Sequence, residues 1–174
     1  MNIKKILNLS LIFTCLVTSC QIEKKVFPSK QYSRHIGDSE QNNEDDFNFK
    51  VCNGNENIYQ YFNLQKGPEY LGEKCSILKV FNDQYKPIRA ISQDGLIRIR
   101  FVVNCEGKAG RFRVLQSDNY LNEFKFNKKV VNQLLEITKS VKFWEIYYFR
   151  ENPIDYYFYL IFKIEDGQIK EILP

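Results

Sequence analysis

Residues 95–116, GLIRIRFVVNCEGKAGRFRVLQ, decide the fold. Apolar side chains occupy every second position from Ile97 to Cys105, which is the period of a half-buried β-strand. A glycine-containing turn follows at 106–110, and residues 111–116 alternate again. The stretch therefore predicts a β-hairpin with one apolar face and one face rich in arginine.

A helix and two further strands are predicted downstream of this hairpin. Asn127 is a typical N-cap, and the helix that it starts runs to about Val141 with its apolar residues on one stripe. Residues 156–165 alternate as a long strand, and Asp166-Gly167 predicts a tight turn into a short strand over 169–173. The order β-β-α-β-β predicts an α+β fold, with an antiparallel sheet of three to four strands and one long helix packed on one face.

The region before the hairpin has weaker patterns. Two short helices are predicted over 56–62 and 73–85, separated by the turn signal Lys66-Gly67-Pro68. Residues 21–50 are mostly polar and lack periodicity, which predicts a disordered tether. We therefore expect the folded domain to comprise residues 51–174.

The first 19 residues predict an export signal. Lys4 and Lys5 precede an apolar stretch of about a dozen residues, which is too short to cross the roughly 30 Å hydrocarbon core of a bilayer. The run Leu16-Val17-Thr18-Ser19-Cys20 resembles the lipobox of bacterial lipoproteins. That resemblance implies cleavage before Cys20 and acylation of its thiol, so that residues 20–50 would link a lipid bilayer to the domain. An ordinary signal peptide cut elsewhere, or a crude membrane anchor, is the alternative.

Charge and cysteine content limit the function classes. The net charge of +4 is too small to favour nucleic acid, which requires a concentrated basic face. Beyond the predicted signal and Cys20, the chain contains Cys52, Cys75 and Cys105. These three allow one disulfide in any of three pairings, or three buried free thiols. Their spacing matches no metal-binding or redox motif, so no metal and no cofactor are expected.

The hairpin stretch also carries a family resemblance. Residues 95–107 resemble the start of the TonB C-terminal domain, with a leading glycine, Phe101 near the strand centre and Asn104 before a glycine turn. The likeness continues through the helix, Trp144 and the strand containing Phe162-Lys163-Ile164. In that family the domain is periplasmic, and its last strand pairs with a short box on outer-membrane transporters. The resemblance implies a non-catalytic protein-binding module whose partner is an envelope protein or a TonB-dependent receptor.

The chain departs from this family at three places. A lipid signal replaces the transmembrane helix, the tether contains only Pro28, and Glu145-Ile146 follows Trp144 where a proline is usual. An accessory or atypical energy transducer is therefore the alternative function. The turn at Asp166-Gly167 also predicts a last strand at the edge that a transporter box would need. Because Gln21 is not the aspartate that often retains lipoproteins at the inner membrane, the outer membrane, facing the periplasm, is the expected location.

The sheet face opposite the helix is the candidate binding surface. It is predicted to present cations and tyrosines: Arg98, Arg100, Arg111, Arg113, Tyr157, Tyr159 and Lys163. Arginine binds carboxylates through two bonds and tyrosine adds flat contact area, so an acidic peptide or a glycan is the expected ligand. The alternative is a face stacked on itself, covered in part by residues 51–94 or paired with acidic residues.

Candidate catalytic groups are sparse. The only histidine, His35, lies in the predicted tether, so no imidazole base is expected beside a nucleophile. The acids considered for a carboxylate pair are Glu106, Asp118, Asp155 and Glu165, and nothing in the sequence places two of them together. The sequence therefore predicts a protein that is not an enzyme, with a small envelope hydrolase as the alternative.

Overall fold

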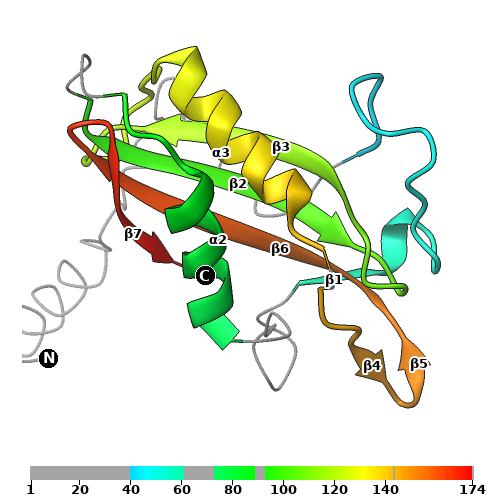
Figure 1. Ribbon diagram of the computed structural model, residues 1–174. Coiled ribbons are helices and arrows are strands. Elements are labelled where there is room, and N and C mark those ends of the chain that lie inside the picture. Colours follow the sequence, from blue (N-terminus) through cyan, green and yellow to red (C-terminus); the bar gives the residue numbers. More distant parts are fainter. Residues whose placement is uncertain (1–39, 61–72, 89–92, 143, 174) are drawn as a thin grey trace, which may run out of the picture. The chain divides into compact units, whose positions relative to one another are not determined.

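A computed structural model describes residues 40–60, 73–88, 93–142 and 144–173 (Figure 1), all of which belong to one compact unit. The predicted export signal, Cys20 and residues 21–39 of the predicted tether lie outside these described residues. Among the described helices, none has the length and apolar content needed to cross a membrane.

Most of the strands form one sheet. They are β1 (Ile58–Gln60), β2 (Gly95–Val103), β3 (Ala109–Ser117), β6 (Asp155–Glu165) and β7 (Gln168–Leu173). The order is β1-β6-β2-β3, and β7 pairs with the same side of β6 as β1, farther along the strand. All pairs are antiparallel except β1–β6. The predicted hairpin, the long strand and the short last strand are confirmed, and the fold is α+β.

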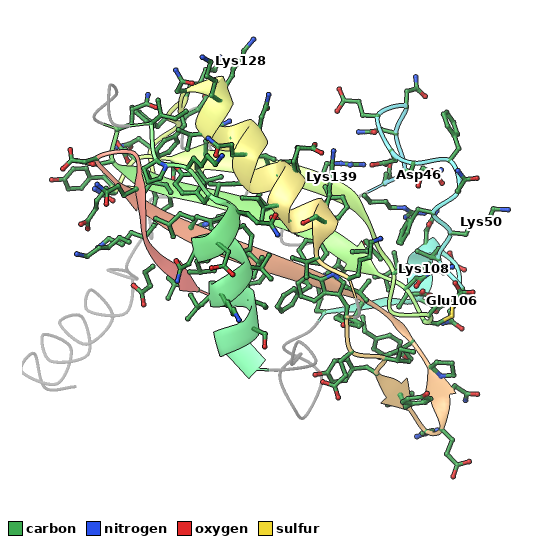
Figure 2. The ribbon with its side chains drawn as sticks, in the orientation of Figure 1. Asp46, Lys50, Glu106, Lys108, Lys128 and Lys139 are labelled. Atoms are coloured by element: carbon green, nitrogen blue, oxygen red, sulfur yellow. A yellow bond between two sulfur atoms is a disulfide. The ribbon has the colours of Figure 1, made fainter. Side chains whose placement is uncertain are left out.

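Two α-helices cover one face of this sheet (Figure 1): α2 (Glu73–Gln84) and α3 (Lys128–Ser140). Asn127 starts α3 as predicted, because its side-chain oxygen accepts a hydrogen bond from the Lys129 N–H at 2.9 Å. Figure 2 shows Lys128 and Lys139 near the two ends of α3.

The core lies between the sheet and the helices. Phe101 and Phe162 are fully buried with Leu134 of α3, and Phe112 packs against the same cluster. From α2, the Phe81 ring lies 4.8 Å from that of Phe162, centroid to centroid. Aromatic rings dominate this cluster, and each buries a large apolar area. The apolar face that the alternation predicted is thus the face that the helices cover.

The structure differs from the sequence prediction at residues 56–62. The described part of this range forms a 3₁₀ turn, η1 (Asn55–Asn57), followed by strand β1 instead of a helix. β1 runs parallel to β6, with Ile58 opposite Asp155. Pairing with a distant strand therefore overrides the local helical spacing.

The segment 40–50 also differs from the prediction of a tether that extends to residue 50. Phe49 is buried against Val102 and Tyr157, and its ring occupies the space that a side chain at Gly110 would need. Only a glycine at that position of β3 leaves room for the ring. The part of the predicted tether that the structure describes is therefore packed on the domain.

Candidate functional site

The cross-strand register brings the predicted binding residues to one face. In β2, Arg98 lies opposite Ile161 of β6, and Arg100 lies opposite Tyr159. On the other side of β2, Arg100 lies opposite Arg113 of β3. Since alternate residues of a strand share a face, the surface away from the helices contains the set we call the arginine face: Arg98, Arg100, Arg113, Tyr157, Tyr159, Ile161 and Lys163. Most of its side chains are half-buried, and Tyr157 is buried beneath Phe49.

Two contacts involve charged residues of the arginine face. The Arg100 guanidinium lies 6.0 Å from the centre of the Tyr157 ring, a cation–π distance. Lys163 Nζ lies 3.0 Å from a carboxylate oxygen of Glu165, and this hydrogen bond is the main cause of the raised Lys163 pKa. The alternative considered for this face, pairing with acidic residues, therefore applies at Lys163.

Arg113 binds the carboxylate of Asp45 through both arms of its guanidinium. The two nitrogen–oxygen distances are 2.7 and 2.8 Å, and one nitrogen also donates to the Glu40 carbonyl at 2.6 Å. The Asp45 side chain is 4% exposed and that of Arg113 is 23% exposed. This hydrogen bonding lowers the pKa of Asp45 and raises the pKa of Arg113. Asp45 belongs to an acidic run that the sequence prediction left in solvent, so this pair was missed.

Arg111, like Tyr157, is a predicted binding residue that is buried in the structure. Between Arg100 and Val102 the register with β3 shifts, so that an extra residue of β3 is accommodated in a β-bulge. Arg111 adopts a φ of 55° there and is 4% exposed. Strict alternation placed it on the arginine face, and the bulge interrupts that alternation.

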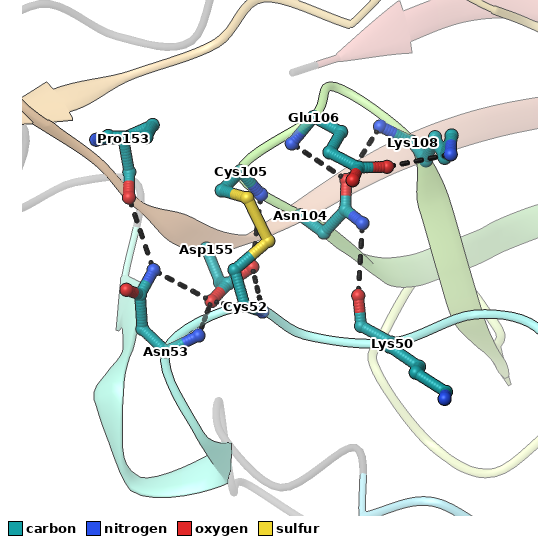
Figure 3. Close-up of a disulfide and its surroundings, with 9 residues drawn as sticks. All are labelled: Lys50, Cys52, Asn53, Asn104, Cys105, Glu106, Lys108, Pro153 and Asp155. Atoms are coloured by element: carbon teal, nitrogen blue, oxygen red, sulfur yellow. Dashed lines mark hydrogen bonds and ion pairs between the residues drawn. A yellow bond between two sulfur atoms is a disulfide. The ribbon is translucent and has the colours of Figure 1, made fainter.

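A disulfide joins the segment before β1 to the turn after β2 (Figure 3). Of the pairings that the sequence left open, the structure has Cys52–Cys105, with Cα atoms 6.0 Å apart. Cys75 belongs to α2, and its side chain is not among those described.

Asp155, at the start of β6, is fully buried beside this bridge. Its carboxylate accepts hydrogen bonds from the backbone N–H groups of Cys52 at 3.0 Å, Asn53 at 2.8 Å and Cys105 at 3.0 Å (Figure 3). The Asn53 side-chain amide adds a further bond at 3.1 Å. We call the disulfide and this carboxylate the clasp. No sequence pattern links Asp155 to the two cysteines, so the sequence prediction missed it.

The clasp contains the only group in the described part of the chain with the composition of a metal site. One donor atom each of Cys52, Cys105 and Asp155 lie within 4.8 Å of one another. Both sulfurs are joined in the disulfide, and both carboxylate oxygens accept N–H donors. The arrangement therefore does not suit a metal ion, since thiolate lone pairs and open carboxylate positions are both lacking.

The four acids considered for catalysis have different neighbours. Asp155 is enclosed in the clasp, and Glu165 pairs with Lys163. Glu106 pairs with Lys108 at 2.6 Å, in the turn after β2 where Figure 2 shows both side chains. Asp118 accepts bonds from the backbone of the β3–α3 loop, and its hydrogen bonds with Asn122 are the main cause of its lowered pKa.

The outer side of β6 is largely occupied. β7 pairs with residues 161–165 of β6, and β1 pairs with residues 155–157. The predicted last strand therefore covers the edge at which an added peptide strand would pair with this part of β6. Such a peptide would have to displace β7 or β1 before it could bond to these parts of β6.

A small hairpin near the Asp155 end of β6 was not predicted. Its strands are β4 (Tyr148–Phe149) and β5 (Asn152–Pro153), and Arg150 and Glu151 form the turn with φ values of 49° and 70°. Such turns favour Asn-Gly, so Arg150-Glu151 is not recognisable as a turn from its residue types. Tyr148 is 62% exposed and Phe149 47% exposed.

No protein-family model matches this chain, and no curated protein or solved structure matches it either. The functional proposal therefore depends on the residues and contacts described above.

Proposed function

We propose that this chain is a lipid-anchored protein of the bacterial cell envelope whose α+β domain is a non-catalytic protein-binding module in the periplasm. The lipobox-like run before Cys20 supports the anchor, and Gln21 favours the outer membrane as its location. The partner in this proposal is an envelope protein that presents an acidic segment to the arginine face.

The observation that carries the proposal is the register of β2, β3 and β6. It lines up two arginines of the central strand, Arg98 and Arg100, with a tyrosine and an isoleucine of β6. Arginine and tyrosine are enriched in the energetically important centres of protein interfaces. The face is half-buried and polar, which suits a surface that binds and releases a partner more than it suits a permanent interface.

A charge-reversal experiment tests this surface. The tagged full chain would be used to capture partners from detergent-solubilised envelopes, with and without the changes Arg98→Glu and Arg100→Glu. We expect the changed protein to lose its specific partners, because like charges repel an acidic segment. Unchanged capture would rule out the arginine face as the binding surface.

The matched control alters the same number of charges on the other layer of the domain. Lys128 and Lys129 are exposed at the start of α3, so Lys128→Glu with Lys129→Glu changes the net charge by the same amount. Acidic residues in the first turn of a helix are favourable, so the control should fold well. We expect it to capture the same partners as the unchanged protein.

The lipid anchor has its own test. Cys20→Ser should leave the chain unable to incorporate labelled fatty acid and should release it from membranes, because acyl chains contribute about 0.8 kcal/mol per buried methylene. Cys15→Ser, within the predicted signal, is the control and should leave labelling intact. Labelling that persists in Cys20→Ser would contradict the lipobox.

A role in TonB-dependent transport is the second candidate, and it is supported only by the sequence resemblance. The occupied outer side of β6 disfavours pairing with a transporter box at that strand. Capture of an outer-membrane receptor in the experiment above would favour an accessory of that transport system.

A further inference from the structure

The contact between Asp45 and Arg113 has the form of a ligand bound to a receptor. The carboxylate is taken bidentately, which is the geometry by which arginine selects planar anions. The same guanidinium also bonds to the Glu40 carbonyl, so it binds a backbone group of the segment together with the side chain.

The segment itself presents that carboxylate on a compact turn. The Asp45 N–H donates to the Asn42 carbonyl at 3.2 Å, and the Asn42 N–H donates to Asp45 Oδ2 at 2.8 Å. The Glu44 N–H donates to the Asn42 side-chain oxygen at 2.9 Å. These local bonds stiffen the turn, so the bound motif is a short acidic turn rather than a single side chain.

The segment is nevertheless lightly attached. Between residues 40 and 48, Asp45 is the only buried residue, and the residues on both sides of it are exposed. A stretch with few buried contacts opens locally at a small cost in free energy. The next firm contact is Phe49, which can stay in place while residues 40–46 leave.

We infer that Arg113 forms a carboxylate-binding subsite of the arginine face, which the chain's own segment 40–46 occupies until an acidic turn of the partner replaces it. This inference rests on the proposed function. It identifies the partner's recognition element as a carboxylate on a turn, with a backbone carbonyl five residues before it. Arg100 lies directly opposite Arg113, so the incoming segment would continue from this subsite onto the centre of the arginine face.

The internal segment acts as a competitor. A tethered ligand has an effective concentration on the order of mM, and an external segment must exceed that advantage to bind. Removing the charge of Asp45 while keeping its shape should therefore expose the subsite to an external carboxylate. Asp45→Asn makes this change.

The test uses a blocked peptide of residues 40–46, EQNNEDD, added to the full chain purified in detergent. Binding is followed by the chemical shifts of backbone amides in β3. We expect Asp45→Asn to bind the peptide at least about tenfold more tightly than the unchanged chain, since its own competitor is weakened. The double change Asp45→Asn with Arg113→Gln should lose this gain.

Two controls make the result specific. Glu44→Gln removes one charge from an exposed neighbour and should bind the peptide no better than the unchanged chain. A peptide with Asn in place of Asp45, EQNNEND, should not bind the Asp45→Asn chain. Hydrogen exchange of residues 40–46 tests independently whether Asp45→Asn releases the segment.

The inference is overturned if Asp45→Asn releases the segment without a gain in peptide affinity, or does not release it. It is also overturned if the gain persists in the double variant. The proposed function is tested separately, because partner capture that depends on Arg98 and Arg100 would survive either outcome.

Discussion

The chain before β1 is attached to the sheet at several places, and two of them, the clasp and the Asp45–Arg113 pair, differ in kind. At the clasp, a covalent bridge and a fully buried carboxylate fix Cys52 and Asn53. At Asp45, one ion pair between a buried carboxylate and a largely buried guanidinium holds a turn whose other residues are exposed. One segment can therefore be fixed permanently at one point and bound reversibly a few residues away. The free energy needed to detach it is large where a covalent bond and a buried carboxylate hold it, and smaller where a single ion pair does.

Breaking the disulfide should have the largest effect. Replacing Cys52 and Cys105 together with serine frees a loop that spans 53 positions. The chain-entropy estimate for that loop is a loss of about 4 kcal/mol in the free energy of unfolding. Urea denaturation measures this, and a reducing agent should have a similar effect on the unchanged chain. Cys75→Ser is the control. A urea midpoint that is the same for the unchanged chain and the double serine variant would contradict the pairing.

The second largest effect is expected at Asp155. Asp155→Asn places an amide among N–H donors of the clasp, so that several of them lose their acceptor. We expect a loss of about 3 kcal/mol in the free energy of unfolding, since each orphaned donor costs about 1–3 kcal/mol. The control Glu171→Gln changes an exposed acid of β7 and should alter the urea midpoint little. Equal midpoints for the two variants would mean that the carboxylate contributes nothing.

The ion pair should contribute less and should depend on pH. Asp45→Asn should cost about 1.5 kcal/mol at neutral pH, a typical value for a hydrogen bond to a charged group. Because folding lowers the Asp45 pKa, its contribution is complete above the unfolded-state pKa of about 4 and is lost as the pH falls through the lower folded value. The difference between the unchanged chain and Asp45→Asn, measured by urea denaturation, should therefore vanish in acid. If the difference in the free energy of unfolding between the two proteins did not change with pH, the effect of Asp45→Asn would come from the shape of the side chain and not from its charge.

The smallest effect is expected for an exposed ion pair of the same sheet. The side chains of Lys163 and Glu165 are 39% and 42% exposed, far more than that of Asp45, so Glu165→Gln should change the free energy of unfolding by less than about 0.5 kcal/mol. Comparing this variant with Asp45→Asn isolates the effect of burial on an ion pair. A loss as large as that of Asp45→Asn would show that burial does not separate the two pairs.

The sequence predicted the elements whose pattern is local. The alternation in β2, β3 and β6 and the cap at Asn127 were sufficient, because each depends on neighbouring residues. The turn at Asp166-Gly167 was found for the same reason. The hairpin at Arg150-Glu151 was not, since its residues do not favour the positive φ values that they adopt.

The remaining features depend on distant partners. Asp45 and Arg113 are 68 positions apart, and Cys52 and Asp155 are 103 positions apart. The positions of three cysteines in a sequence do not determine which two form a disulfide, and an alternating pattern does not predict a bulge at Arg111. The arginine face was therefore predictable as a surface, whereas the internal carboxylate that occupies one of its arginines was not.

The disulfide also determines how the domain responds to mechanical force. A pull on the chain upstream of Cys52 passes through the sulfur atoms directly to Cys105, in the turn after the central strand β2. β1 and α2 lie inside the covalent loop, so they cannot be drawn out while the bridge is intact. Stretching from the two termini would thus extend only residues outside the loop, and reduction of the cystine would add the length of the hidden residues to the force–extension curve.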